Sequence, residues 1–479
     1  MIDYKYKSTP FKHQSEDFLI SRDREEYALF WEMGLGKSKT TIDTIAWLWC
    51  KGQIDAVLIL ANKGSYRNWL TKEIPEHMPD YVDWVGTYWS SAASADLKKS
   101  YDLLSRPAHG KLKIFVMNIE ALAFDRSYKL AYDFVNCHRT LMAVDESTTI
   151  KNRDAKRTKA AIKVGKLARY KRILTGTPIT QSPLDLYSQV QFLDPHLLGF
   201  TSFYSFRARF ADMIKITAGN RAFTKINGYK NLDELQELMK PWSSRRTKLE
   251  CLDLPEKIYQ TYEVELTDDQ KRHYKTLKDE AIAVLQGRIV TAPIVLTKLL
   301  RLHQLICGHL TTDDGQIIPV PSNRIAALMD ILDETQGKVI IWANYVADIK
   351  LIVEKLRQDY SDESVVAYYG AVNSEDRQEA VRAFQEDSHC RFFVGNTATG
   401  GKGITLTAAN TVVYYSNDYN LENREQSEDR AHRIGQTRSV NYVDLICPNT
   451  VDEKIVSALR QKKRLSAQVL GDEWRNWLG

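Results

Sequence analysis

The sequence offers little that would cross-link the chain or anchor it in a membrane. Its six cysteines lie far apart and form no C-x-x-C pair, which argues against a zinc site and against a disulfide framework. Scattered thiols are typical of a reducing cytoplasm. Residues 1–12 are polar and lack the apolar core of a signal peptide, and no apolar run approaches the roughly 18 residues of a membrane span. We therefore expect a cytoplasmic or nucleoid-associated protein with no zinc and no membrane contact.

An excess of one charge is also missing. The formal net charge is only +5 over 479 residues, so the chain is not a polycation and any surface for nucleic acid must be local. Apolar residues make up 43% of the chain and charged residues 27%, which is enough to bury a core in each of two domains of ordinary size. The sequence also has no fixed-period repeat and no low-complexity tract.

Short apolar, β-branched runs recur between stretches with helical periodicity. In the first half these runs are residues 57–60, 114–117, 141–144 and 172–174. In the second half they are residues 339–342, 365–368, 392–394 and 412–415. Continuous apolar strands that alternate with helices predict an α/β fold whose parallel sheets are covered on both faces.

A charged, helix-like stretch with few strand signals separates the two halves. We place the domain boundary within this stretch, between residues 245 and 246. The predicted first domain, 1–245, ends in a helical insertion at about 196–245. The predicted second domain, 246–479, contains another helical insertion at about 260–320.

A glycine-rich loop lies between a predicted strand and a predicted helix. Its glycines would let backbone N–H groups approach phosphate oxygens, and the helix N-terminus would add its dipole. Lys37 would reach the β- and γ-phosphates of a nucleotide, and Ser38 would bind Mg²⁺. Trp31 stands where the strict phosphate-loop pattern has its first glycine, so an ordinary glycine-rich turn is the alternative. The predicted nucleotide-binding residues of the loop are Met33, Gly34, Leu35, Gly36, Lys37, Ser38 and Lys39.

Two adjacent carboxylates, Asp145 and Glu146, end the apolar run at residues 141–144. An aspartate at the C-terminal end of a strand can hold Mg²⁺, so Asp145 joins Ser38 as a predicted metal ligand. Glu146 would polarise the attacking water. A solvated acidic turn is the alternative for an isolated Asp-Glu pair, but the upstream phosphate loop favours the catalytic interpretation.

Further motifs follow in order along the chain. In the first half they are residues 10–14 (PFKHQ), 31–38 (WEMGLGKS), 62–69 (NKGSYRNW), 118–122 (NIEAL), 145–152 (DESTTIKN) and 174–179 (LTGTPI). In the second half they are residues 369–370 (YG), 400–409 (GGKGITLTAA) and 426–436 (QSEDRAHRIGQ). These motifs resemble those of the Swi/Snf-type branch of the superfamily-two helicase-related ATPases. The last string distinguishes this branch from the DEAD-box RNA helicases, and the resemblance extends over nearly the whole chain.

The resemblance implies two RecA-like parallel-sheet lobes with a helical insertion between them. It also implies that ATP binds in the cleft between the lobes. Lys37, Asp145 and Glu146 would serve catalysis from the first lobe. Arg430 and Arg433 would reach the γ-phosphate from the second lobe as arginine fingers.

Further contacts are implied only by the resemblance. Gln14 would read adenine, and Gly403 and Gln426 would contact the nucleotide. Nucleic acid would lie across the other face of both lobes. Its predicted contacts are Asn62, Lys63, Asn118, Lys151, Asn152, Thr175, Gly176, Asn344 and Thr397. The implied activity is that of a DNA-stimulated ATPase that moves along duplex DNA. The short length of the chain favours a compact phage or bacterial form.

The sequence departs from the family's pattern without losing a phosphate, metal or water ligand. Trp31 replaces an acidic residue, and Lys402 replaces an apolar one. Residues 145–152 correspond to the family's acidic box, in which Ser147 and Thr148 replace Ala-His. The resemblance assigns that histidine to the link between the ATP site and the family's third motif, here residues 174–179, so the link must run differently in this chain.

Two patterns and several functions stay open. Residues 151–172 hold ten basic residues and one acidic residue, which form either a phosphate-binding rail or a solvated helix face. Trp69 and Trp342 could stack on bases, although packing is the favoured role. The alternative functions are a strand-separating DNA or RNA helicase, a motor subunit of a larger DNA-processing complex, and an inactive DNA-binding scaffold. The intact catalytic residues argue against the scaffold.

Overall fold

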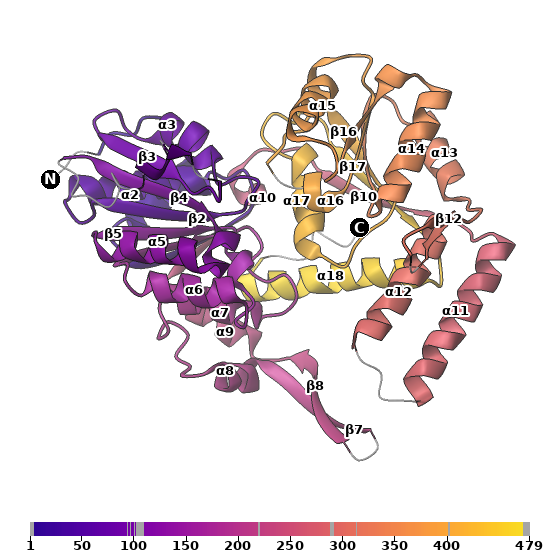
Figure 1. Ribbon diagram of the computed structural model, residues 1–479, viewed down its shortest axis with the longest axis horizontal. Helices are drawn as coiled ribbons and strands as arrows, with labels where there is room; N and C mark the ends of the chain where they lie inside the picture. The colour runs from indigo at the N-terminus through magenta and orange to yellow at the C-terminus, as the bar shows by residue number, and fades with distance from the viewer. Residues whose placement is uncertain are drawn as a thin grey trace. The chain divides into compact units, whose positions relative to one another are not determined.

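The computed structural model describes residues 4–92, 94–95, 97–99, 101, 110–218, 221–287, 292–312, 314–400 and 403–472. The chain divides into two compact units. In Figure 1 the first runs from indigo to pink and also includes the yellow segment from residue 462, and the second runs from pink through orange to yellow. The first unit comprises Met1–Asp253 together with Lys462–Leu478, and the second comprises Leu254–Gln461. The domain boundary between residues 245 and 246 stays a prediction.

A seven-stranded sheet forms the centre of the first unit, and every strand pair in it is parallel. In spatial order its strands are β3 (Trp84–Tyr88), β4 (Leu112–Asn118), β2 (Ala56–Ala61), β5 (Thr140–Asp145), β6 (Tyr170–Leu174), β1 (Glu26–Trp31) and β9 (Ser243–Arg246). The four apolar runs of the first half are β2, β4, β5 and β6, so their prediction as parallel strands is confirmed.

Helices cover both faces of this sheet, which explains why its strands are continuously apolar. In β2, Leu58 and Leu60 pack into one core, while Val57 and Ile59 pack into the other. One face is covered by α1 (Lys12–Ser21), α2 (Lys37–Cys50), a π-helical turn at Trp69–Glu73 and α3 (Ile74–His77). The other is covered by η2 (Ile119–Ala123), α5 (Asp125–Asn136), η3 (Ser147–Ile150), α6 (Lys156–Gly165), α7 (Asp185–Leu193), α8 (Phe203–Phe210) and α9 (Leu232–Met239), of which α5, α6 and α7 lie in succession in Figure 1.

The insertion at about 196–245 is only partly helical, which differs from the prediction. Besides α8 and α9 it holds an antiparallel ribbon of β7 (Ala211–Ala218) and β8 (Arg221–Tyr229), which extends away from the sheet in Figure 1. Ile214 and Ile216 alternate with polar residues on β7, and this period of two favours an extended strand. The insertion ends in β9, which pairs with β1, and α10 (Lys248–Cys251) follows it.

The second unit contains a six-stranded sheet that is also fully parallel. In spatial order its strands are β10 (Lys257–Glu263), β17 (Val440–Ile446), β16 (Ala409–Tyr414), β13 (Lys338–Trp342), β15 (Phe392–Gly395) and β14 (Val365–Tyr368). The four predicted runs of the second half are β13, β14, β15 and β16. The α/β prediction is therefore confirmed in both units.

Long helices and one short hairpin complete the second unit. The insertion predicted at about 260–320 begins within β10 and is then mainly helical. The elements outside the sheet are α11 (Asp268–Gly287), α12 (Ala292–Cys307), β11 (His309–Thr311), β12 (Ile317–Pro319), α13 (Arg324–Glu334), α14 (Val346–Asp359), η4 (Asp362–Ser364), α15 (Ser374–Glu386), α16 (Thr397–Gly400), α17 (Leu421–Ala431) and α18 (Val451–Leu470). The end of α18, from Lys462 onward, belongs to the first unit, where Val469 and Leu470 enter the core. Among the helices that the structure describes, none combines the length and the apolar character needed to cross a bilayer.

Candidate active site and nucleic-acid interface

The loop between β1 and α2 has the backbone conformation of a phosphate-binding loop. Gly34 and Gly36 have φ angles of 84° and 83°, a left-handed conformation that glycine adopts readily. A Cβ atom at Gly36 would lie 2.1 Å from Nε2 of Gln14, so a larger side chain there would also displace that amide. α2 begins at Lys37, directly after the loop, and the N-terminus of such a helix favours negative charge.

Lys37 is nearly buried and lies against the strand that leads into the loop. Its Nζ donates hydrogen bonds to the carbonyl oxygens of Trp31 at 2.8 Å and Glu32 at 3.3 Å. A phosphate can replace these neutral acceptors, because hydrogen bonds between charged groups are the stronger ones. The ammonium of Lys39 instead forms an ion pair with Asp43 at 2.7 Å, which leaves only its backbone for a nucleotide.

Gln14, predicted to read adenine, contacts the phosphate loop. Its Nε2 donates to the carbonyl oxygen of Leu35 at 3.0 Å, and its Oε1 accepts from the backbone N–H of Phe11 at 3.0 Å. Nε2 of His13 lies 2.8 Å from the same Leu35 carbonyl. The amide nitrogen of Gln14 therefore contacts the loop, its amide oxygen caps the N-terminus of α1, and its contact with adenine stays a prediction.

Asp145 is the last residue of β5, and its carboxylate is held by an indole. Nε1 of Trp69 donates to Oδ2 of Asp145 at 3.0 Å. Burial raises the pKa of Asp145, while the hydrogen bond from Trp69 and the positive charge of Lys37 favour the ionised carboxylate. Lys37 follows the phosphate loop and Asp145 ends β5, so the two side chains lie near each other at the carboxyl edge of the sheet.

Glu146 has an unusual backbone conformation for a residue with a side chain. Its φ is 51°, in the left-handed region that few non-glycine residues occupy. Backbone strain of this kind is found at functional sites, where surrounding contacts hold it. Oε2 of Glu146 accepts a hydrogen bond from Oγ1 of Thr175 at 3.2 Å, so the acidic box and the third motif are in direct contact.

A second, fully buried link joins the acidic box to the third motif. Oγ of Ser147 donates to Oε1 of Gln189 at 2.7 Å, and Nε2 of Gln189 donates to the carbonyl oxygen of Pro178 at 2.8 Å. Ser147 and Gln189 are both 0% exposed. Residues 147–148 are Ser-Thr here, where the family has Ala-His. In this chain the hydrogen bonds of Ser147 and Gln189 connect the acidic box to the third motif.

Residues 400–409 and 426–436, which resemble the family's fifth and sixth motifs, meet within the second unit. Nη1 of Arg430 donates to the carbonyl oxygen of Ile404 at 2.9 Å, and Nη1 of Arg433 approaches the same oxygen at 3.4 Å. Burial lowers the pKa of Arg433, and the charge of Asp429 opposes this shift. Gly403 has a φ of 76°, while Gly401 and Lys402 lie outside the described residues.

Gln426 is buried at the centre of α17. Its Nε2 donates to Oε1 of Glu422 at 3.2 Å. Its Oε1 has no hydrogen-bond partner within the described ranges of the chain. A buried amide oxygen without a partner is available to accept a hydrogen bond from a ligand. The contact of Gln426 with nucleotide stays a prediction.

The residues predicted to contact nucleic acid in the first unit follow the ends of neighbouring strands. Ala61 and Asn118 are paired in the register of β2 and β4, so Asn62 and Asn118 lie close together, with exposed Lys63 beside them. Lys151 donates to Oγ1 of Thr180, and exposed Asn152 accepts from the backbone of Asp154.

Several predicted contact residues are buried or only partly exposed. Thr175 is 0% exposed and bonded to Glu146, which places it beside the proposed catalytic carboxylates. The backbone of Gly176 packs against β1, where a Cβ atom would meet the Trp31 carbonyl oxygen at 3.3 Å. In the second unit, Thr397 is buried and Asn344 donates its backbone N–H to Ser416 at 2.8 Å.

The two tryptophans that could have stacked on bases are buried. Trp342 is 0% exposed and Trp69 is 2% exposed, so packing, the role that their residue type favours, is confirmed. The hydrogen bond from Trp69 to Asp145 was not expected. Sequence reasoning also missed Gln189, which belongs to no predicted motif.

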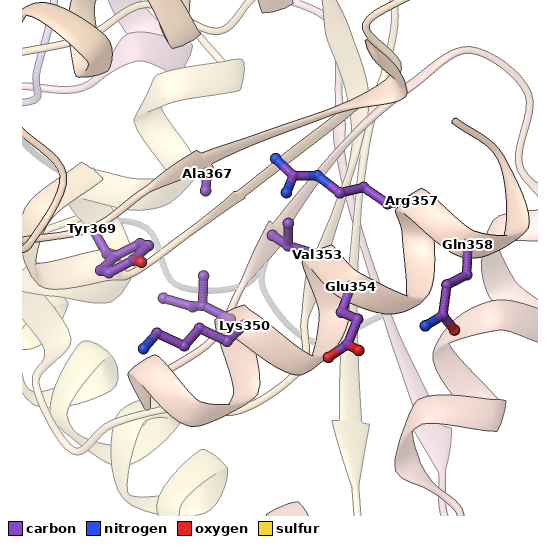
Figure 2. Close-up of a pocket in the computed structure, with 8 residues that line it drawn as sticks. Lys350, Val353, Glu354, Arg357, Gln358, Ala367 and Tyr369 are labelled. Carbon is purple, nitrogen blue, oxygen red and sulfur yellow. The ribbon is translucent and has the colours of Figure 1, made fainter. Parts of the chain in front are cut away.

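A cavity of about 370 Å³ in the second unit lies away from these residues. Figure 2 shows Lys350, Val353, Glu354, Arg357 and Gln358 on α14, with Ala367 and Tyr369 beside them. None of the predicted site residues lines this cavity. The chemical groups that phosphoryl transfer needs gather at the carboxyl edges of the sheets instead.

Comparison with known families agrees with this arrangement. Residues 12–310 match the family model described as the SNF2-related domain, and residues 323–435 match that of the helicase conserved C-terminal domain. The first match alone covers more than half of the chain. The chain belongs to the SNF2-related family. The predicted resemblance is thereby confirmed, and so is the fold of two RecA-like lobes that goes with this family of helicase-related ATPases.

The SNF2-related chain is similar to longer curated proteins. It is 28% identical over 382 residues to the TATA-binding protein-associated factor MOT1 of Saccharomyces cerevisiae, a match that covers 69% of this chain and 20% of that protein. It is 25% identical over 453 residues to the probable ATP-dependent DNA helicase CHR23 of Arabidopsis thaliana, which covers 92% of this chain and 41% of that protein. The chain thus spans less than half the length of these relatives.

Among solved structures, the chain is similar to the Sulfolobus solfataricus SWI2/SNF2 ATPase core in complex with dsDNA. The two are 25% identical, with a TM-score of 0.44, and the match covers 100% of this chain and 97% of the other.

Proposed function

We propose that this SNF2-related chain hydrolyses ATP in response to DNA and moves along duplex DNA. The observation that carries the proposal is the gathering of Lys37, Asp145 and Glu146 at the carboxyl edge of one parallel sheet. Phosphoryl transfer requires a loop that holds phosphates beside carboxylates that hold a metal ion and orient water. In this proposal the lobes are residues 1–245 and 246–479, and the protein works in association with the nucleoid.

The oxygen donors at this edge suit Mg²⁺. Mg²⁺ is usually bound by one or two carboxylates together with substrate phosphates and water. The Ser38 hydroxyl and the Asp145 carboxylate provide such ligands. Across the part of the chain that the structure describes, no three His, Cys, Asp or Glu side chains gather to hold a metal by themselves. Bound with ATP, the ion would neutralise charge on the β- and γ-phosphates.

The remaining chemistry is divided between the two lobes. Glu146 orients and polarises the attacking water, and Lys37 binds the phosphates. Arg430 and Arg433 contribute positive charge from the second lobe when the nucleotide cleft closes. The Ile404 carbonyl is a neutral acceptor for both guanidinium groups, which a charged phosphate can replace.

DNA is the proposed polymer for two reasons. The string at residues 426–436 resembles the branch of the superfamily whose members commonly track duplexes. The names of the two curated relatives also point to DNA, because one is a factor associated with the TATA-binding protein and the other is a probable ATP-dependent DNA helicase.

Rates of ATP hydrolysis test the proposal. They should be measured without polymer and with single-stranded DNA, duplex DNA or RNA. Duplex DNA should stimulate hydrolysis most. Equal stimulation by RNA would support an RNA motor, and hydrolysis that no polymer changes would contradict the proposal.

A second assay separates movement from unwinding. The chain should displace the third strand of a DNA triplex while ATP is hydrolysed, and it should leave a forked duplex intact. Unwinding of the fork would identify a strand-separating helicase.

A further inference from the structure

The loop that follows β2 contacts the proposed metal site through one short turn. Trp69–Glu73 forms a π-helical turn, a rare conformation that recurs at functional sites. Trp69 begins the turn and Glu73 ends it. Both are absent from the residues assigned to ATP chemistry in the proposed function.

Trp69 holds one oxygen of Asp145. Its ring is 2% exposed and packs in the core with Ile74, while its Nε1 donates to Oδ2 of Asp145 at 3.0 Å. An indole can donate one hydrogen bond and accept none. The contact therefore restrains the carboxylate without competing with a metal ion for Oδ1.

Ser38 is the other proposed metal ligand. It lies in the first turn of α2, whereas Asp145 ends β5. The two ligands therefore come from different elements, so a single ion can join them only if each is held in a fixed direction.

We propose that Trp69 is a positioning residue that orients Asp145 toward the Mg²⁺ ion that Asp145 shares with Ser38. Partners that hold metal ligands in place commonly change metal affinity by tenfold or more when they are removed. The inference rests on the proposed function, because that proposal assigns Mg²⁺ to these two ligands.

The Trp69→Phe variant tests the indole. It keeps the buried ring and removes only the N–H donor. Binding of a fluorescent N-methylanthraniloyl-ADP should be titrated with MgCl₂ and, separately, in EDTA. We expect the Mg²⁺ concentration for half-maximal tight binding to rise by about tenfold, while the affinity in EDTA is unchanged.

Trp47→Phe is a matched control. Trp47 is also buried, and its Nε1 donates to Oδ1 of Asp23 at 2.9 Å, a carboxylate outside the proposed site. This variant should keep the wild-type Mg²⁺ requirement. Equal shifts in the two variants, or no shift in Trp69→Phe, would overturn the proposal.

The Mg²⁺ dependence of the wild-type chain separates this inference from the proposed function. A wild-type chain whose nucleotide binding ignores Mg²⁺ would instead contradict the proposed metal site itself.

Discussion

The carboxyl edges of the two parallel sheets carry different chemistry. The first unit has both signs of charge there, with Lys37 on backbone carbonyls, Asp145 bonded to Trp69, and Glu146 bonded to Thr175. At the corresponding motifs of the second unit, Arg430 and Arg433 both approach the Ile404 carbonyl. In the proposed function the first unit therefore binds the nucleotide and its metal ion. The second unit contributes two arginines that both approach one backbone carbonyl.

Among the variants predicted here, Lys37→Ala should have the largest effect on nucleotide binding and ATP hydrolysis. Both nucleotide binding and hydrolysis should fail, since the first unit would lose the ammonium that meets the phosphates. We expect hydrolysis to fall by about 10³ or more, the upper end of what one positioned donor contributes. Phosphate release and thermal melting should be measured on the same sample.

Lys51→Ala is the control for this change, because Lys51 is an exposed lysine just beyond the other end of α2. It should bind and hydrolyse ATP as the wild type does. Normal hydrolysis in Lys37→Ala would remove the loop from the ATP site.

Arg433→Ala should separate the two units' contributions. Turnover should fall by about 10³, the lower range for an arginine finger, while nucleotide affinity stays close to that of the wild type. DNA should still bind but no longer stimulate hydrolysis. Nucleotide titration and DNA-stimulated turnover measure the two effects separately.

Arg438→Ala, which changes an exposed arginine nearby, should leave both quantities unchanged. The competing interpretation is that Arg433 only packs the second unit through the charge of Asp429. It predicts a lower melting temperature together with DNA-stimulated hydrolysis in the folded fraction.

The sequence predicts the central strands of both sheets well and their edges poorly. All eight apolar runs are strands, because burial on both faces leaves no polar positions. Within these two sheets, the strands that the sequence does not predict are β3, β9, β10 and β17, of which the first three lie at sheet edges. β9 consists of Ser-Ser-Arg-Arg, which pairs through its backbone and gives no apolar signal. β17 is interrupted by Asn441 and Asp444.

At the candidate site, the sequence predicts residues that form local motifs and misses contacts between residues that are far apart in the chain. The phosphate loop and the acidic pair are local patterns, so their residue types and order are sufficient to predict them. Trp69 and Asp145 are 76 residues apart, and Ser147 and Gln189 are 42 residues apart. Only the folded sheet brings such pairs together, and a single tryptophan or glutamine has no motif to reveal its partner.

A buried ion pair gives the second unit a pH dependence of its own. Arg324 is 0% exposed and bonded to Asp452. Burial alone would raise the pKa of Asp452, but Arg324 and His303 hold it below its ordinary value. A depressed carboxyl pKa stabilises the folded state above the unfolded pKa of about 3.9, and that contribution is lost as the pH falls further.

Asp452→Asn should therefore destabilise the protein at pH 7, by about 3–5 kcal/mol, because it leaves a buried arginine without its counter-charge. Urea unfolding followed by tryptophan fluorescence gives this value. Part of the difference between variant and wild type should disappear below about pH 4. Asp359→Asn breaks a partly exposed pair with Lys355 and should cost less than about 1 kcal/mol. Equal costs for the two variants would contradict the role of burial.

The smallest expected effect concerns the basic helix α6 of the first unit. Lys156, Lys159 and Lys163 are exposed and lie on one face of the helix, at positions i, i+3 and i+7. If this row binds phosphates, neutralising all three to glutamine should lower the slope of log affinity against log salt by about 0.9 for each lost contact with duplex DNA. Basal ATP hydrolysis should not change, since none of the three belongs to the ATP site. The matched control is the triple glutamine variant at Lys271, Lys275 and Lys278, three exposed lysines on α11 of the second unit. A row that binds DNA changes the slope only when α6 is altered, whereas a solvated helix face leaves the slope unchanged in both variants. Titrations of duplex DNA from low to physiological salt distinguish these outcomes, because general charge loss would shift both variants alike.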